Sequence, residues 1–526
     1  MRRVLLLYPT AFAAAAVVRI AAANGGQYRG VDLALTLLTT VVIAAIATAL
    51  ALVTAHLVRG DSVVERATPI AAIALGWFFY FFPLQSTLSL LSWRLSRAAV
   101  VVPIGLLVSL AAVTWVLRQS ADRLRSVNRF AAAFAFILLA FGVIGTVTAD
   151  GAGSKTLARS ALARELAVPI RAARTPATNV PPRDIYLILL DGHSNARVRR
   201  DILNDSVTWF EDSLRALGFV IPPDAKSNYL QTILSLPSIL NFNHVTRIAN
   251  DAGARSTDYS LPKFLIENNR AARFLKSRGY KYLLFPSAWW DATQYSPLAD
   301  SIWAAPSTFN VRDALRRTEL RSVVWGSTLL RPALRKPKLP DLRKFESLER
   351  VPSDTAPTFA FVHMLLPHLP FVYDANCQPL AQPITDSEEK DSPAQRAAYL
   401  AQMRCVDRLT VDAVRTILAR SSTPPVILIL GDHGSRFSDV RFYEHPESVS
   451  REFVQERFGA FAAAYLPDGG GDAFERPITL VNVLRHVLSY YFGADLPPLP
   501  DDQYVSGERP YQFYPLSTLR LGATHP

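Results

Sequence analysis

The sequence predicts an N-terminal α-helical membrane domain of about five spans, followed by an α/β domain in the rest of the chain. Three observations lead to this fold class. Hydrophobic residues make up 50% of the 526 positions, and before residue 150 they fall in long uncharged runs. Charged residues and prolines recur every few positions after Asp150–Gly153. Beyond that point, short β-favouring runs alternate with helical patterns.

The expected spans are each close to the roughly 20 residues that cross the hydrocarbon of a bilayer: 4–23, 32–57, 68–91, 99–117 and 130–148. The third contains Pro83 and Gln85, so a re-entrant or interfacial turn is the alternative there. Arginines precede the first span and crowd the loop before the fifth, and the positive-inside rule makes both segments cytoplasmic. An odd number of spans then places the α/β domain on the periplasmic, or extracytoplasmic, side of a cytoplasmic (inner) membrane.

Met1–Asn24 also has the shape of a signal peptide, because Arg2 and Arg3 precede an apolar run that ends in alanines. Cleavage leaves four spans that begin outside. The α/β domain is therefore expected outside under either interpretation.

A connector follows the spans, over 151–182. Leu157, Leu162, Leu166 and Ile170 recur at near-helical spacing among arginines, which suits a basic helix lying on an anionic membrane surface. A solvated linker helix fits equally well. Lys and Arg exceed Asp and Glu by 56 to 44, and much of this excess lies in the membrane loops and the connector. We therefore expect membrane lipids as partners, and no nucleic acid.

The two cysteines, Cys377 and Cys405, both lie in the domain expected outside the cell membrane. An oxidising compartment allows a disulfide between them, and two buried thiols are the alternative. Their spacing is not that of a zinc–cysteine site.

The α/β domain is expected to hold a parallel or mixed sheet with helices on both faces. The predicted strands are the apolar runs Asp184–Leu190, Tyr282–Phe285, Thr358–Val362, Val426–Leu430 and Ala460–Leu466. The helical patterns between them lie around 207–217, 262–278, 395–420 and 477–492.

Chemically reactive side chains follow several of these strands. Asp191 comes directly after the first, His363 after the third, and Asp432-His433 after the fourth and a single glycine. Active sites of such folds form beyond the carboxyl ends of the strands. A lone acid after a strand is usually a turn or cap residue, but several at one edge favour a site. Thr232 adds a hydroxyl where the chain turns into a helix.

These residues resemble a known family. Asp191-Gly192, the Thr232-x-x-Ser235-x-Pro237 segment and Gly431-Asp432-His433-Gly434 are similar to motifs of the alkaline phosphatase superfamily. The nearest branch is the sulfatase-like membrane enzymes, which include phosphoethanolamine transferases and lipoteichoic acid synthases. The resemblance implies a transmembrane domain at 1–150, an interfacial linker at 151–182, a sulfatase-like catalytic domain at 183–500 and a C-terminal tail at 501–526.

The resemblance also implies a role for each motif residue. Metal ligands map onto Asp191, Thr232, Asp432 and His433, with zinc expected and manganese or magnesium as alternatives. His363, His368 and His445 correspond to histidines that hold phosphoryl oxygens or the leaving group. Thr232 corresponds to the nucleophile, whose poor reactivity as a hydroxyl is overcome when a divalent cation lowers its pKa.

The implied function is a membrane-anchored, divalent-metal-dependent transferase or hydrolase of phosphate esters, acting through a covalent Thr232 intermediate on lipid or envelope glycan. One alternative is a sulfuric ester hydrolase. Residues 235–239 match the sulfatase pattern Cys/Ser-x-Pro-x-Arg except that Ile239 replaces the arginine. Another is a sulfatase-like scaffold without activity, and the intact set of Asp191, Thr232, Asp432 and His433 argues against it.

Overall fold

The computed structural model describes residues 2–23, 30–91, 98–171, 182–287, 293–303, 342–351, 356–384, 391–438 and 445–522. Contacts divide the chain into two compact units. The first holds the N-terminal helices up to Thr156, and the second holds the described residues from Leu157 onward.

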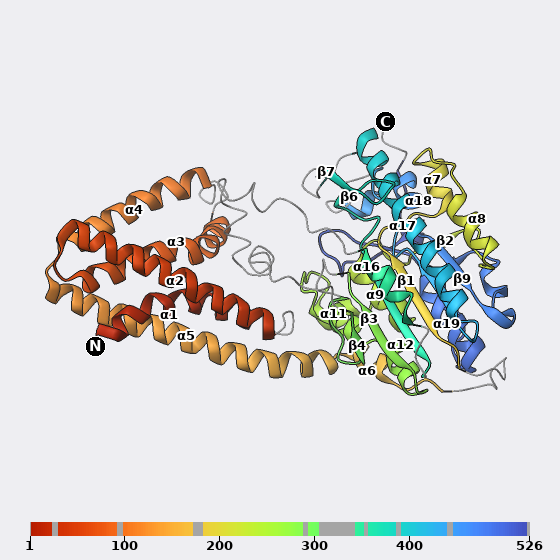
Figure 1. Ribbon diagram of the computed structural model, residues 1–526, viewed down its shortest axis with the longest axis horizontal. Coiled ribbons are helices and arrows are strands. Elements are labelled where there is room, and N and C mark those ends of the chain that lie inside the picture. Colours follow the sequence, from red (N-terminus) through yellow and green to blue (C-terminus); the bar gives the residue numbers. More distant parts are fainter. Residues whose placement is uncertain are drawn as a thin grey trace. The chain divides into compact units, whose positions relative to one another are not determined.

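The first unit consists of long helices that match the expected spans one by one (Figure 1). They are α1 (Arg2–Ala23), α2 (Gly30–Arg59), α3 (Val63–Leu91), α4 (Ala98–Arg118) and α5 (Ala121–Ala158). Among the described residues, stretches of α1, α2, α4 and α5 are long and apolar enough to cross a membrane. Helix α3 is continuous through Pro83 and Gln85, where a turn was the alternative. Helix α5 also runs past Asp150–Gly153, because no proline interrupts it there.

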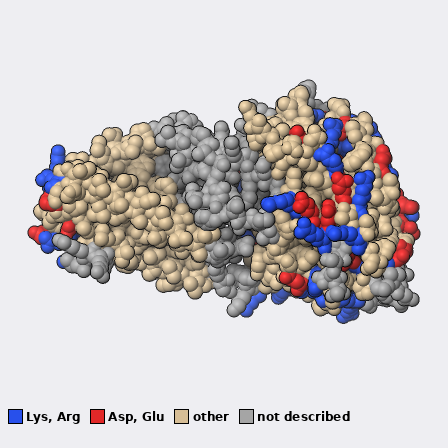
Figure 2. All heavy atoms as spheres, in the orientation of Figure 1, with Lys and Arg blue, Asp and Glu red and all other residues tan. Residues whose placement is uncertain are grey.

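The surface of the first unit is apolar. Leu57, Leu107, Phe130 and Phe141 are all more than two-thirds exposed, which suits contact with lipid chains. Figure 2 shows a face of this unit almost free of charged side chains, with the charges gathered at one end. Some polar groups inside it pair with each other: the Tyr8 hydroxyl donates to Asn128 Oδ1 at 3.0 Å.

The second unit is built on a six-stranded mixed sheet with the order β4-β3-β5-β1-β8-β9. The strands are β1 (Ile185–Leu190), β3 (Lys281–Phe285), β4 (Ser301–Ile302), β5 (Thr358–Met364), β8 (Val426–Leu430) and β9 (Ala462–Tyr465). Strand β1 lies parallel between β5 and β8, and β9 runs antiparallel along β8. Every residue of β1, β5 and β8 is buried, as expected for strands covered on both faces.

Helices cover the two faces of this sheet, and alternate residues of β1 enter two separate cores. Leu187 and Leu189 pack with α9 (Thr232–Asn241), α11 (Ser260–Glu267), α12 (Arg270–Lys276) and α19 (Leu480–Phe492). Ile188 and Leu190 pack with α8 (Trp209–Ala216), α16 (Arg343–Leu348) and α17 (Pro393–Arg420). The helix expected over 262–278 is two helices, because the Asn269 side chain caps α12 by accepting from Ala272 N at 2.8 Å.

The leucines of the connector face the protein. In α6 (Ala161–Ala167), Leu162 and Leu166 are almost completely buried in the first core, so they meet neither a membrane surface nor solvent. Asp251 of α10 (Ile248–Ala252) explains the position of α6, since its carboxylate accepts from Ala161 N and Leu162 N at 2.9 Å. The expectation of a lipid-facing or solvated apolar side was therefore wrong for these leucines.

Shorter elements complete the second unit. They are α7 (Ala196–Asp201), β2 (Ala225–Lys226) paired with β10 (Ile478–Thr479), the hairpin β6 (Phe371–Tyr373) and β7 (Pro379–Ile384), α18 (Arg451–Phe458), and β11 (Tyr504–Val505) paired with β12 (Tyr514–Pro515). A disulfide between Cys377 and Cys405 joins the hairpin to α17, which confirms the predicted bridge. The C-terminal segment packs on the chain that leads into α9: Tyr504 N donates to Asn228 O at 2.9 Å.

Candidate active site

The carboxyl ends of β1, β5 and β8 meet at one edge of the sheet, because these strands are parallel neighbours. Asp191 leaves β1 at this edge, His363 lies near the end of β5, and Gly431 carries the chain from β8 into Asp432-His433. Gly192 then turns the β1 loop with φ of 71°, a backbone conformation that favours glycine. The rings of His368 and His433 both lie beside it.

Asp191 is buried and bonded to His363. The His363 Nε2 atom lies 3.1 Å from Asp191 Oδ2, and its Nδ1 lies 2.8 Å from the Thr293 hydroxyl. Burial lowers the pKa of His363 to about 3, so the ring is neutral at physiological pH. A neutral ring that donates from Nε2 fixes the orientation of the Asp191 carboxylate. The structure thus places His363 behind Asp191, with 1% of its surface exposed.

Asp432 and His433 complete the second side of the site. Asp432 Oδ1 accepts from Gly192 N at 2.9 Å. The Nδ1–H of His433 donates to Gly434 O at 3.0 Å, which leaves the lone pair of Nε2 facing Asp432 Oδ2 at 3.3 Å and Asp191 Oδ1 at 3.7 Å. Burial lowers the pKa of His433 well below its ordinary value, so this ring too is neutral.

These side chains fit a bound cation. The ligand atoms of Asp191, His368 and His433, which we call the ligand cluster, all lie within 4.8 Å of one another. The Nδ1 of His368 bonds Leu369 O at 2.7 Å, so its Nε2 is the atom turned to other partners. Asp191 Oδ1 and Asp432 Oδ2 are buried without a hydrogen-bond partner. Burial and the neighbouring Asp432 carboxylate raise the pKa of Asp191, and a cation at this position removes that cost.

Thr232 lies at the same edge. It is the first residue of α9, and its Oγ1 is 3.2 Å from His433 Nε2. The backbone N–H groups of a helix N-terminus favour negative charge, such as that of a phosphate. Ser235 is different: it is buried, and its hydroxyl donates to Tyr229 O at 3.1 Å.

The comparison with protein families agrees with this geometry. The family model described as Sulfatase matches residues 227–461, which include Thr232, His368 and Asp432-His433. The second unit therefore contains a sulfatase-like domain. This confirms the resemblance and the fold class predicted from the motifs.

Solved structures with low sequence identity also align with the chain. One is the C-terminal periplasmic domain of EcEptC from Escherichia coli, with 14% identity over 67% of this chain and 97% of that chain (TM-score 0.44). Another is the lipooligosaccharide phosphoethanolamine transferase EptA from Neisseria meningitidis, with 13% identity over 98% and 99% (TM-score 0.41). A third is the lipoteichoic acid synthase LtaP from Listeria monocytogenes, with 11% identity over 68% and 82% (TM-score 0.38). Among curated proteins, no match was found.

His445 lies apart from the hydrogen bonds described above. It is exposed and precedes the short helix Pro446–Ser448, where its backbone carbonyl accepts from Ser448 N at 3.1 Å. Among the described residues, its ring forms no hydrogen bond with the ligand cluster. Residues 439–444, directly before it, lie outside the described residues.

The sulfatase-like domain also contains a buried arginine that sequence reasoning missed. Arg457 Nε donates to Leu230 O and its Nη1 to Gly434 O, both at 2.8 Å, so it ties the segment before Thr232 to the turn after His433. Burial raises the pKa of Asp191, and the charge of Arg457 opposes that rise; burial lowers the pKa of His433, and the same charge adds to that lowering. In the sequence, Arg457 stands among other charged residues of α18, a pattern typical of a solvated helix face. No sequence signal therefore distinguishes it as buried.

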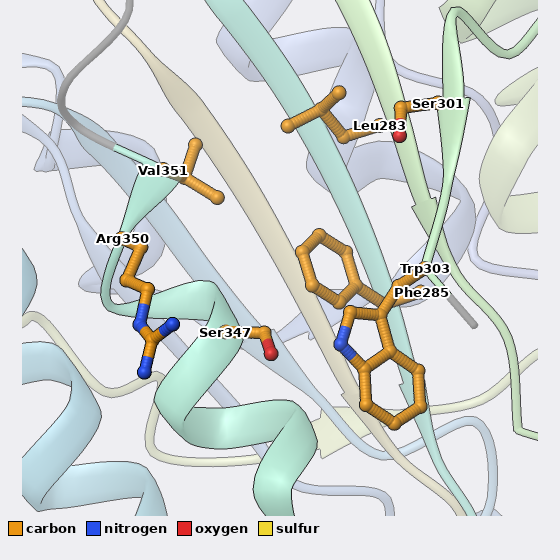
Figure 3. Close-up of a pocket in the computed structure, with 7 residues that line it drawn as sticks. All are labelled: Leu283, Phe285, Ser301, Trp303, Ser347, Arg350 and Val351. Carbon is orange, nitrogen blue, oxygen red and sulfur yellow. The ribbon is translucent and has the colours of Figure 1, made fainter. Parts of the chain in front are cut away.

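A cavity of about 320 Å³ lies elsewhere in the domain, beside β3 and β4, and none of its lining residues belongs to the ligand cluster. Figure 3 shows Phe285 and Trp303 on one side of it and Arg350 on the other. Lys344 lies between this region and the site: its Nζ is 5.8 Å from a Trp303 ring centroid and donates to His363 O at 2.9 Å.

Proposed function

We propose that the protein is a membrane-anchored, divalent-metal-dependent transferase or hydrolase of phosphate esters that works through a covalent intermediate on Thr232. The observation that carries this proposal is the position of the Thr232 hydroxyl, 3.2 Å from His433 Nε2 beside two buried carboxylates with unpaired oxygens. A hydroxyl, neutral imidazoles and carboxylates arranged in this way suit metal-assisted attack on an ester.

We propose Asp191, Asp432 and His433 as metal ligands, with Thr232 as the nucleophile beside them. His368, expected from the resemblance to contact the phosphoryl group, belongs to the ligand cluster, so we propose it as a further ligand. Nitrogen and carboxylate donors suit zinc, and manganese or magnesium are alternatives. When bound, the ion supplies charge that lowers the pKa of the Thr232 hydroxyl and neutralises a phosphoryl oxygen.

The residues of the chain then act in two steps. Thr232 Oγ1 attacks phosphorus, its proton leaves to solvent, and the bond between phosphorus and the donor oxygen breaks as that oxygen takes up a proton. Water or an acceptor alcohol next attacks the phosphothreonine ester and restores the hydroxyl. The N-terminus of α9 favours the phosphoryl charge, and His363 holds Asp191 in place. His445 stays a predicted contact of the phosphoryl oxygens or the leaving group.

Lipid or envelope glycan on the extracytoplasmic side is the proposed substrate class. Helices long enough to cross a membrane hold the domain near lipid-linked donors. The Cys377–Cys405 disulfide supports an oxidising compartment, since such bonds are rare in the cytosol. Arg2 and Arg3 at the start of α1, and the arginines at the end of α4 and in the first turns of α5, support the same orientation.

The sulfuric ester alternative is less well supported. A formylglycine made from Ser235 needs that side chain at the site, whereas Ser235 is 2% exposed and donates to Tyr229 O. Ile239 also cannot provide the charge of the arginine in the sulfatase pattern.

Assays of aryl phosphate and aryl sulfate hydrolysis by the full-length protein in detergent separate these functions. We expect metal-dependent phosphate hydrolysis that falls by at least about 10³-fold in Thr232→Ala and partly survives in Thr232→Ser, which keeps a hydroxyl. Sulfate hydrolysis that survives Thr232→Ala and is lost in Ser235→Ala contradicts the proposal. Absence of both activities with bound metal favours the inactive scaffold.

A further inference from the structure

One helix on the second face of the sheet contacts two of the three loops that carry ligand-cluster residues, those of Asp191 and His368. Helix α17 presents the buried side chains of Tyr399 and Gln402 one turn apart, and neither belongs to the ligand cluster. The two loops are also bonded to each other, because His368 N donates to Asp191 O at 3.0 Å. Contacts from α17 therefore act on both loops at once.

Tyr399 holds the loop after Asp191. Its hydroxyl donates to Gly192 O at 2.8 Å and accepts from Ser194 N at 3.1 Å. Ser194 in turn bonds the loop after His433, since its Oγ accepts from Ser435 N at 2.9 Å. The Tyr399 hydroxyl thus connects the segments that follow Asp191 and His433.

Gln402 holds the loop that carries His368. Its Nε2 lies within hydrogen-bond distance of three carbonyl oxygens, Pro367 O at 3.2 Å, His368 O at 3.0 Å and Pro370 O at 3.3 Å. Its Oε1 accepts from Val372 N at 2.8 Å and Tyr373 N at 3.2 Å. The His368 ring bonds Leu369 O inside this same segment, so the direction of Nε2 follows the backbone that Gln402 fixes.

We infer that Tyr399 and Gln402 of α17 are positioning residues that hold the Asp191 and His368 loops in the geometry that binds the divalent metal. The inference rests on the proposed function, because it assumes that the ligand cluster binds an ion. Side chains that orient metal ligands through hydrogen bonds typically change metal affinity or activity by 10–100-fold when they are replaced. Neither residue touches the ion or the substrate in this account.

Two conservative substitutions test the inference in the full-length protein. Gln402→Glu keeps the shape and the acceptor oxygen of the side chain but loses the N–H groups that face the three carbonyls. Tyr399→Phe keeps the ring and loses the hydroxyl. Thr410→Val is the matched control, because Thr410 is fully buried on the same helix and its hydroxyl donates to Val406 O within that helix.

The measurement is the zinc dissociation constant of each protein by competition with a chelator, together with the melting temperature of the metal-free forms. We expect zinc to bind about 10–100-fold more weakly to Gln402→Glu and Tyr399→Phe than to wild type, and unchanged binding to Thr410→Val. Aryl phosphatase activity lost at limiting zinc should return in excess zinc.

Other results contradict the inference in distinguishable ways. Wild-type zinc affinity in both substituted proteins shows that α17 does not position the ligands. Weak binding that excess zinc does not overcome, with metal-free melting temperatures far below that of Thr410→Val, shows a purely structural role. Failure of wild type itself to bind zinc, manganese or magnesium contradicts the proposed metal site on which the inference depends.

Discussion

At the scale of single residues, the site is a balance of buried charge. Asp191 and Asp432 lie side by side with little solvent, next to imidazoles that burial keeps neutral. Arg457, which donates to the backbone carbonyl of Leu230, supplies a positive charge near these carboxylates. Two buried carboxylates so close together repel each other, and a divalent ion between them offsets that cost.

This balance predicts how metal-dependent stability varies with pH. Burial and the Asp432 carboxylate raise the pKa of Asp191 to about 8 in the metal-free fold. The folded state then holds a proton that the unfolded state has already released, so the metal-free protein loses stability as pH rises from about 4 toward 8. Metal replaces that proton, so the stabilisation by metal grows with pH. We expect zinc to raise the melting temperature more at pH 8 than at pH 6.

A thermal melt with zinc and with chelator at several pH values checks this prediction. Asp191→Asn is the control, since an amide does not titrate, and its metal-free melting temperature should depend less on pH than that of wild type. If the metal-free melting temperatures of wild type and Asp191→Asn depend equally on pH, the titration of Asp191 is not the cause of the effect.

From the residues alone, the candidate site was predictable where a side chain follows a strand or, as for Thr232, begins a helix, and the family resemblance added His368. Asp191, His363 and Asp432-His433 follow apolar runs, so their meeting at one sheet edge follows from the parallel pairing. Tyr399, Gln402 and Arg457 lie within amphipathic helices, where a polar residue usually faces solvent. Their partners are backbone atoms of distant loops, which no local pattern reveals.

At the scale of elements, α6 shows how an amphipathic pattern can be assigned to the wrong partner. The near-helical spacing of its leucines predicts one apolar side but does not say what covers it. In the structure Leu162 and Leu166 are buried in the first core. The Asp251 carboxylate that caps α6 lies about ninety positions later in the sequence, so the position of the helix depends on tertiary structure.

Replacing Leu162 tests this packing. Leu162→Ala should lower the free energy of unfolding of the second unit by about 2–5 kcal/mol, because it leaves a cavity in a fully buried site. Arg164→Ala, on the exposed side of the same helix, should change it by less than about 0.5 kcal/mol. Denaturant unfolding monitored by fluorescence measures both. A Leu162→Ala protein as stable as wild type indicates that α6 is not part of the core.

The strands were more predictable than their directions. Apolar runs bounded by breakers located β1, β3, β5, β8 and β9 to within a few residues. The antiparallel direction of β9 depends on how the chain returns through α18, and the run itself carries no information about it. The division of 262–278 into α11 and α12 depends on a single asparagine cap.

At the scale of the whole molecule, membrane helices and a disulfide occur in one chain. Four of the five expected spans, those in α1, α2, α4 and α5, are long and apolar enough to cross a membrane among the described residues. Length and hydrophobicity alone predicted them, because crossing a bilayer constrains both. The arginines at the start of α1 and around the junction of α4 and α5, together with the bridge between Cys377 and Cys405, support an extracytoplasmic sulfatase-like domain.

Cysteine labelling tests that orientation. Arg255→Cys places a thiol on an exposed part of the second unit, and Arg123→Cys places one in the basic segment at the start of α5. The native cysteines are bonded to each other and do not react. A membrane-impermeant maleimide should label Arg255→Cys in intact spheroplasts and Arg123→Cys only after permeabilisation. The reverse pattern contradicts the proposed side of the membrane.

The central claim is that Thr232 carries the transferred group. Its most direct test is mass spectrometry of the full-length protein, mixed with zinc and an aryl phosphate and quenched during turnover, followed by peptide mapping. The account predicts an added phosphoryl group on the peptide that contains Thr232, absent with chelator and absent in Thr232→Ala. An unmodified Thr232 in an active enzyme, or a modification at Ser235 instead, contradicts it.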